Sequence, residues 1–147
     1  MQRLLAATVL VSFVISSAAA DTAKEILDAT GIKGGLVVHL GCGDGKLTAA
    51  LCADDRFLVH GLDRDPVNVQ RAREHVRRLE EYGPVSIDQL AGSRLPYVDN
   101  LARLIVVEDA GGIAREELLR VLAPRGVALI KAHSDRQVAN DDAKTNR

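Results

Sequence analysis

The sequence predicts an α/β protein built on a doubly wound parallel sheet. Five short apolar runs are spaced along the 147-residue chain, amphipathic segments separate them, and a glycine-rich loop follows the first run. Strands separated by helices pair in parallel through right-handed crossovers, and the helices then cover both faces of the sheet. We therefore predict a Rossmann-like sheet of five strands in the order 3-2-1-4-5.

Residues 1–20 are predicted to be a signal peptide rather than part of this fold. Arg3 gives a positive start, an apolar run follows from Leu4 to Ile15, and small residues precede Asp21. This order is typical of a secretory signal, with cleavage near Ala20-Asp21. We expect export to the periplasm or the cell exterior. No stable membrane span is expected after cleavage, because the apolar run is short for a bilayer; an uncleaved anchor is the alternative.

The first predicted helix begins at a capping box, Thr22-Ala-Lys-Glu25, and continues to about Thr30. Residues 36–40 are a continuous apolar run with one histidine, as expected of a strand buried on both faces. Residues 41–45 form a tight glycine loop, and residues 46–53 are predicted to be a short helix.

Residues 57–62 form the second predicted strand, which ends at Asp63. Asp65 and Pro66 then suit the N-cap and first position of a helix that continues to about Tyr82. The later elements are predicted as a strand at 85–90, a strand at 104–107, a helix at 113–122, a turn at 124–126 and a strand at 127–130. The domain is thus assigned to residues 21–132, and residues 133–147 to a polar, disordered tail.

Charge and composition exclude several classes of partner and cofactor. The formal net charge is −1, so nothing in it argues for nucleic acid. With no Trp, two Tyr and two Phe, the chain also has little aromatic surface for stacking bases. Two cysteines cannot form a four-thiolate zinc site, and no metal is predicted. We expect Cys42 and Cys52 to be free thiols, because the helix between them holds them too far apart for a disulfide.

The candidate site lies where the predicted strands end. Glycines in the segment Gly41–Gly45 allow positive φ angles and a close ligand approach, and the start of the next helix adds N–H donors. Asp63 stands 20 residues after Gly43, at the end of the second strand, where a carboxylate can accept both hydroxyls of a ribose. Glu108 ends the fourth strand at the same edge. These residues predict a nucleoside-bearing cofactor at the switch point of the sheet.

Two other phosphate-binding or nucleotide-binding motifs fit this loop less well. The dinucleotide fingerprint needs its third glycine at position 46, where this chain has Lys46, so a nicotinamide cofactor is the weaker alternative. A P-loop needs Ser or Thr after Gly45-Lys46, and this chain has Leu47.

Four segments taken in order resemble class I S-adenosylmethionine-dependent methyltransferase domains of the type 11-like kind. They are residues 37–45, 59–63, 95–100 and 118–126. The resemblance implies that Gly41, Cys42, Gly43 and Gly45 border the amino-acid end of S-adenosylmethionine, that Asp63 holds the ribose and that Arg64 lies near the adenine. The predicted topology places Glu108 at the same crevice. The resemblance names no methyl acceptor. It also names no catalytic residue, because in-line methyl transfer needs mainly positioning and desolvation.

This chain departs from the family pattern at three places. His39 stands where the family has Asp or Glu, and Leu90-Ala91 stands where many members have Gly-Asp. The family sheet also continues with two more strands, whereas only seventeen residues follow Ile130. We interpret His39 and His60 as satisfied core histidines. The alternative function is therefore a non-catalytic interaction or spacer module that keeps the fold.

The N-terminal signal joined to this domain is also similar to the start of exported planctomycete-type proteins. In those proteins such a domain precedes a PQQ-binding-like β-propeller. The resemblance implies that longer relatives of this chain carry a β-propeller as a second domain.

Overall fold

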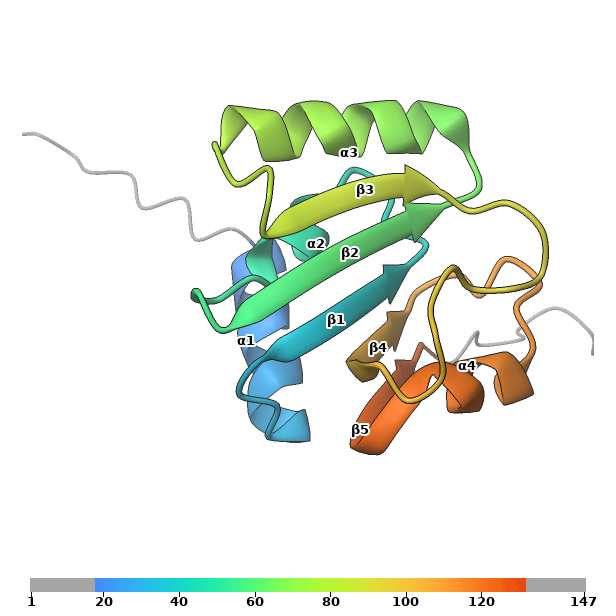
Figure 1. Cartoon of the computed structure of the whole chain (residues 1–147). Coiled ribbons are helices and arrows are strands. Elements are labelled where there is room, and N and C mark those ends of the chain that lie inside the picture. Colours follow the sequence, from blue (N-terminus) through green and yellow to red (C-terminus); the bar gives the residue numbers. More distant parts are fainter. Residues whose placement is uncertain (1–17, 132–147) are drawn as a thin grey trace, which may run out of the picture.

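The computed structural model describes residues 18–131, which form five strands and four helices (Figure 1). In chain order they are α1 (Ala18–Thr30), β1 (Gly35–Leu40), α2 (Lys46–Ala50), β2 (Phe57–Asp63), α3 (Pro66–Arg78), β3 (Val85–Gln89), β4 (Ala102–Val107), α4 (Arg115–Val121) and β5 (Leu122–Ile130). The expected signal peptide falls almost wholly, and the expected polar tail wholly, outside the described residues. The predicted cleavage point after Ala20 falls within the first turn of α1.

The strands form one all-parallel sheet in the order β3-β2-β1-β4-β5, which confirms the predicted topology. β1 is central: Val37 pairs with Val59 of β2 on one side and with Leu104 of β4 on the other. Because all strands are parallel, the C-terminal ends of β1, β2 and β4 meet at the same edge of the sheet. The loops after these three strands therefore converge.

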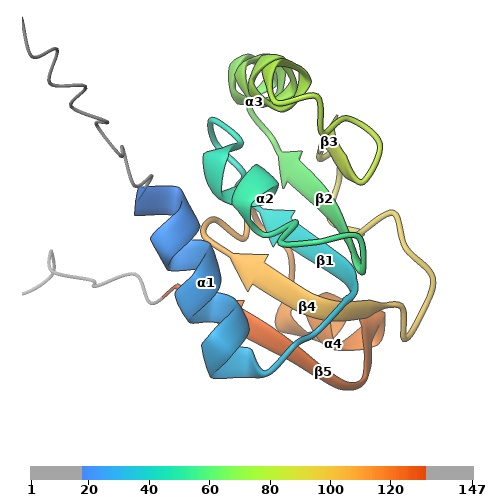
Figure 2. The ribbon, with the colours of Figure 1, turned by 90° about the vertical axis from the view of Figure 1, so that its left-hand side faces the viewer.

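Helices cover both faces of the sheet, as predicted (Figures 1 and 2). Alternate residues of β1 serve two separate cores. Val37 belongs to the core shared with α1, α2 and α3, whereas Val38 belongs to the core shared with α4 and the loop between β3 and β4. A strand in which both sets of side chains are buried needs the continuous apolar run seen in this sequence.

The start of the first helix differs from its prediction. α1 begins at Ala18 rather than at a cap on Thr22, and the Thr22 hydroxyl donates to the Ala18 carbonyl inside the helix at 2.8 Å. The alanines before Thr22 favour helix, so the first turn forms upstream of the capping box. The start of α2 at Lys46 agrees with its prediction; its N-cap residue is Gly45, and the Asp44 side chain accepts a hydrogen bond from the Lys46 N–H at 3.1 Å.

Two helices are shorter at their C-terminal ends than predicted. α2 ends at Ala50 rather than at residue 53, and α3 ends at Arg78 rather than near Tyr82. After α3 the backbone of Glu80 takes a positive φ of 57°, which is incompatible with continued helix.

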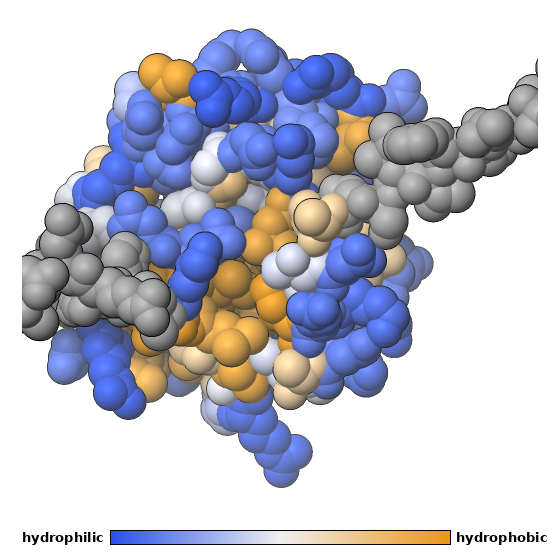
Figure 3. All heavy atoms as spheres, turned by 180° about the vertical axis from the view of Figure 1, so that it is seen from behind, coloured by the Kyte–Doolittle hydropathy of each residue, from blue (hydrophilic) through white to orange (hydrophobic). Residues whose placement is uncertain are grey.

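β5 is longer than predicted because the expected turn lies inside it. The strand covers Leu122–Ile130, and the pairing register with β4 shifts between Ala102 and Leu104, opposite the Pro124–Gly126 segment. β5 is also an edge strand of the sheet. Its residues Leu129 and Ile130 are 36% and 55% exposed. An apolar area is visible on the side turned away from the viewer in Figure 1 (Figure 3). Among residues 18–131, no helix has the length and apolar character needed to cross a membrane.

Candidate functional site

Two glycines of the loop after β1 are required by packing, and one faces open space. Gly41 has φ 75°, and a Cβ there would lie 2.6 Å from the Asp109 nitrogen. Gly45 has φ 79°, and a Cβ there would lie 2.9 Å from the Cα of Ala72 in α3. Gly43 has φ 55°, and a Cβ there would meet nothing within 4 Å. The loop is thus clamped at both ends, and its middle is accessible.

The Asp63 carboxylate fastens this loop to the end of β2. One oxygen, Oδ2, accepts the Gly43 N–H at 3.0 Å and the Asn68 side-chain amide at 3.3 Å. The other, Oδ1, accepts the Asp65 N–H at 2.9 Å. Asp63 is only 9% exposed. Two carboxylate oxygens can accept about four hydrogen bonds, so capacity for a further donor remains.

Cys42 contributes its backbone, not a reactive thiol, to the loop. Its side chain is buried, and it faces Gly61 of β2, where an added Cβ would lie 3.1 Å from the Cys42 Cβ. Burial, together with the negative charge of Asp63, raises the pKa of the Cys42 thiol to about 12. The thiol is therefore neutral at physiological pH and a poor nucleophile. Cys42 and Cys52 are both free, as predicted.

Arg64 links two loops across the same edge of the sheet. It follows β2, and its guanidinium donates to the Gly92 carbonyl at 2.6 Å and to the Gly111 carbonyl. These glycines belong to the loops after β3 and after β4, respectively. The side chain therefore spans from the end of β2 to the end of β4, past the end of the central strand.

His39 and Glu108 meet beside the glycine loop. His39 is fully buried, and its Nδ1 lies 2.8 Å from the Thr48 hydroxyl of α2. Its Nε2 has no hydrogen-bond partner among the described residues and lies 3.8 Å from Oε2 of Glu108. The prediction of a satisfied core histidine is therefore wrong for one of the two ring nitrogens. The Glu108 side chain is 40% exposed, and the neighbouring imidazole lowers the pKa of its carboxyl group.

Both ring nitrogens of His60 have hydrogen-bond partners, and the residue lines a cleft on the face of the sheet opposite to His39. Its Nδ1 lies 2.5 Å from the Tyr97 hydroxyl and its Nε2 lies 2.8 Å from Asp88, which also binds Arg73 at 2.9 Å. Burial raises the pKa of the Tyr97 phenol, so the phenol stays neutral and can donate to the ring.

The cleft has a volume of about 570 Å³, and its lining includes Leu62, Leu90, Ala91 and Arg94. Sequence reasoning missed Tyr97, whose partner is 37 residues away.

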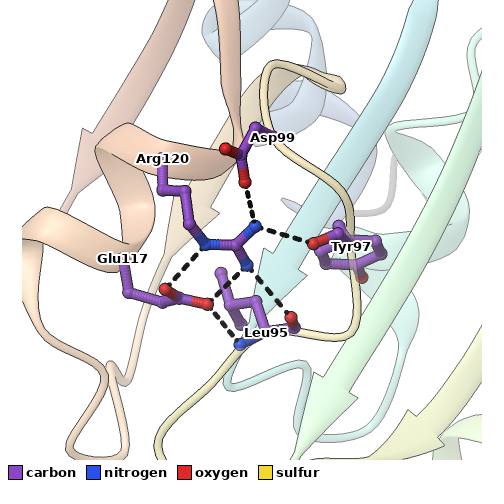
Figure 4. A network of polar contacts seen from close by, with 5 residues as sticks. All are labelled: Leu95, Tyr97, Asp99, Glu117 and Arg120. Carbon is purple, nitrogen blue, oxygen red and sulfur yellow. Dashed lines mark hydrogen bonds and ion pairs between the residues drawn. The ribbon is translucent and has the colours of Figure 1, made fainter.

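The loop that carries Tyr97 is held in place by Arg120 of α4 (Figure 4). The guanidinium donates to the carbonyls of Leu95 and Tyr97 and forms ion pairs with Glu117 and Asp99. Glu117 in turn accepts the Leu95 N–H at 2.8 Å. α4 thereby fixes the path of the chain between β3 and β4, which forms one wall of the cleft.

The structure brings the predicted residues together at one edge of the sheet. Gly41, Cys42, Gly43, Gly45, Asp63, Arg64 and Glu108 all lie in or beside the loops after β1, β2 and β4. Within residues 18–131, no group of three or more His, Cys, Asp or Glu side chains is arranged to hold a metal ion. The arrangement offers an open backbone position at Gly43, the recessed carboxylate of Asp63 and the half-exposed carboxylate of Glu108, which suit a polar organic ligand.

Residues 37–126 match a family model described as a methyltransferase domain. Solved structures share the fold. A protein of Methanococcus maripaludis described as a candidate S-adenosyl-L-methionine-dependent methyltransferase matches with a TM-score of 0.67 and 24% identity, over 74% of this chain and 52% of that one. A geranyl diphosphate methyltransferase in complex with S-adenosylmethionine matches with a TM-score of 0.64 and 17% identity, over 74% and 47%.

A third solved structure with this fold is named for a different activity. The cyclase SpnF matches with a TM-score of 0.62 and 22% identity, over 71% of this chain and 41% of that one. The chain thus spans about half the length of these structures. No curated protein matches it by sequence.

Proposed function

This chain belongs to the methyltransferase domain family, and we propose that it binds S-adenosylmethionine and transfers its methyl group. The observation that carries the proposal is the meeting of the glycine loop, Asp63 and Glu108 at the C-terminal ends of β1, β2 and β4. In open parallel sheets this edge, at the switch point between β1 and β4, is where ligands bind.

The residues present fit such a cofactor. Gly43 leaves room for a ligand to approach the backbone, because nothing lies within 4 Å of the position a side chain would take. Asp63 keeps capacity to accept a ribose hydroxyl beside its three protein donors. S-adenosylmethionine itself supplies an electrophilic methyl group, so the protein contributes mainly position and a water-poor site.

A pair of glycine substitutions tests the site with a matched control. Gly43 and Gly31 both have positive φ angles, 55° and 68°, and both face open space. Gly31 follows α1, at the opposite end of β1. Gly43→Ala and Gly31→Ala should each cost about 1 kcal/mol of stability. Only Gly43→Ala should weaken binding of S-adenosylhomocysteine to the full chain, measured by calorimetry.

Asp63→Asn provides the second arm, with Asp65→Asn as its control. Asn is as good an N-cap as Asp, so the change at Asp65 should preserve α3. Loss of the Asp63 charge should weaken S-adenosylhomocysteine binding, whereas the control should bind like the wild type. A folded wild-type chain that binds neither S-adenosylmethionine nor S-adenosylhomocysteine would refute the proposal.

The second candidate function is a non-catalytic module that keeps this fold. The observation that favours it is the internal pairing of the crevice groups, since Arg64 binds two loop carbonyls and Asp63 binds three protein donors. The two candidates differ in one measurement. A catalytic domain binds the cofactor in the calorimetric titration, and a module of this kind remains folded without binding it.

We also propose that the protein is exported, with support from the N-terminal sequence alone. Cleavage near Ala20-Asp21 would remove Ala18–Ala20 from the first turn of α1 and leave Asp21 at the N-terminus. N-terminal sequencing of the protein recovered from the periplasm or medium should begin at Asp21. A chain that stays in the cytosol with Met1 intact would contradict export.

A further inference from the structure

His39 holds a buried ring nitrogen for which the fold supplies no hydrogen bond. The residue is fully buried in the central strand, and among the described residues Nε2 has no hydrogen-bond partner. A buried polar atom left in this way is costly, so its position calls for an explanation. Nε2 is aimed toward Glu108, whose Oε2 lies 3.8 Å away, beyond hydrogen-bond distance but within reach of a charge interaction.

The groups that face the two ring nitrogens together favour one tautomer of His39. Nδ1 lies 2.8 Å from the Thr48 hydroxyl, which can donate to it. The ring proton then sits on Nε2 and points toward the Glu108 carboxylate. The opposite tautomer would direct a lone pair at that carboxylate, which is unfavourable.

The backbone places the Glu108 carboxylate at the glycine loop. The backbone N–H of Glu108 donates at 3.0 Å to the carbonyl of Leu40, the residue directly before Gly41. The side chain is 40% exposed, so it faces solvent beside the glycine loop rather than the core. Three charged or titratable groups act on the pKa of the Glu108 carboxyl: His39 and Lys131 lower it, and Asp44 raises it. His39 is the largest of these influences.

We propose that His39 is a positioning residue that holds the Glu108 carboxylate at the amino-acid end of the crevice, where it pairs with the ammonium group of the ligand. This inference rests on the proposed function. The family resemblance places an acid at position 39; here the carboxylate comes from the end of β4, and a histidine on β1 orients it. A carboxylate that faces a protonated amine forms a charge-assisted hydrogen bond, and an oriented carboxylate loses less freedom in forming it.

The first test needs no ligand. Nitrogen NMR of the wild-type chain should show the Nε2–H tautomer of His39, and carbon NMR should show a higher pKa for Glu108 in His39→Leu than in the wild type. His39→Gln keeps an N–H donor and should restore part of the difference. Thr48→Val, which leaves the ring in place, should weaken the tautomer preference. The Nδ1–H tautomer, or an unchanged Glu108 pKa in His39→Leu, would overturn the positioning role.

The second test compares two probes that differ at the amino-acid end. S-adenosylhomocysteine carries the ammonium group, and 5′-methylthioadenosine lacks the amino-acid end. Glu108→Gln and His39→Leu should each weaken S-adenosylhomocysteine binding roughly tenfold, about the effect of one hydrogen bond to a charged group. The double variant should be no weaker than Glu108→Gln alone, and 5′-methylthioadenosine should bind all four proteins alike.

The outcomes separate this inference from the proposed function. Equal loss of both probes in the variants would show that His39 and Glu108 support only the fold, which overturns the inference while binding itself stands. A wild-type chain that binds neither probe refutes the proposed function and the ammonium pairing with it. The NMR result then still decides whether His39 orients Glu108.

Discussion

At the residue scale, the same residue type serves opposite purposes within one five-residue loop. Gly41 and Gly45 are closed in by Asp109 and Ala72, whereas Gly43 is open. The pattern of alternating glycines therefore has two separate causes. The outer glycines let the loop pack between α3 and the chain after β4, and the middle glycine leaves the backbone accessible.

Gly45→Ala should be far more harmful to stability than Gly43→Ala. The new methyl group would lie 2.8 Å from the Ala72 Cβ and 2.9 Å from its Cα, so helix α3 itself would have to move. With the positive φ added, we expect a loss of about 2–4 kcal/mol, against about 1 kcal/mol for Gly43→Ala. Urea unfolding measures both; equal losses would show that the contact with α3 relaxes freely.

Arg64→Ala should strengthen the binding of S-adenosylhomocysteine several-fold. The guanidinium occupies the space between Gly92 and Gly111, at the end of the crevice that the family resemblance assigns to adenine. We expect a nucleoside to enter there only after those hydrogen bonds break. The substitution should cost about 1 kcal/mol of stability, because the lost hydrogen bonds are exposed.

Arg71→Ala on the exposed side of α3 makes the same change in net charge and should leave affinity unaltered. Calorimetry on the three proteins gives the comparison. Weaker binding by Arg64→Ala would show instead that the guanidinium contacts the ligand directly, at the position near the adenine that the family resemblance implies.

At the scale of elements, α4 determines the path of a loop that has no regular structure of its own. Between β3 and β4 the chain contains no helix, and Arg120 and Glu117 hold it through its backbone groups (Figure 4). Both side chains are largely buried, at 19% and 15% exposed. A short helix can thus fix a loop of about a dozen residues by satisfying its carbonyls rather than by covering it with apolar surface.

Glu117→Gln should make the free energy of unfolding less dependent on pH in the acidic range. The Arg120 guanidinium, followed by the Leu95 N–H, lowers the pKa of Glu117 from 4.5 to about 2. A group with a depressed folded-state pKa contributes stability that is complete above pH 4.5 and is lost as the pH falls toward 2. The variant should be less stable at pH 7 and should lose less on acidification across this range.

Urea midpoints at pH 7 and near pH 3 test this expectation, with the exposed neighbour Glu116→Gln as the control. The control should keep the pH dependence of the wild type. An unchanged pH dependence in Glu117→Gln would mean that the ion pair with Arg120 does not persist in solution.

At the scale of the whole molecule, burial falls from the centre of the sheet to the β5 edge. Val37, Val38, His39 and Leu40 of β1 are all fully buried between two paired strands. β5 pairs only with β4 within residues 18–131, and none of its residues is fully buried. An edge strand with exposed apolar residues is open to pairing with further chain.

Hydrogen exchange should follow this gradient. Amides of β1 should exchange only on global unfolding, and amides of β5 should exchange by local opening at lower free energy. Mass spectrometry of peptides from residues 35–40 and 122–130 measures both. Protection in β5 equal to that in β1, and dependent on protein concentration, would show that another chain covers this edge in solution.

The strand order, the two-sided cover of helices and the meeting of the loops after β1, β2 and β4 at one edge of the sheet were all predictable from local patterns. Each depends on residues adjacent in sequence: apolar runs such as 36–40, the Asp65-Pro66 helix start, and a glycine loop placed directly after a strand. Parallel topology then brings Asp63 and Glu108 to the same edge, because crossovers have a fixed hand.

The tertiary structure alone decided which groups those residues meet. Arg64 reaches carbonyls 28 and 47 residues away, Tyr97 bonds a histidine 37 residues away, and His39 keeps one ring nitrogen unpaired beside Glu108 within the described part of the chain. Such pairings depend on distances between elements that are far apart in the chain. Local propensity carries no information about these distances, because the packing of the whole sheet and its helices sets them.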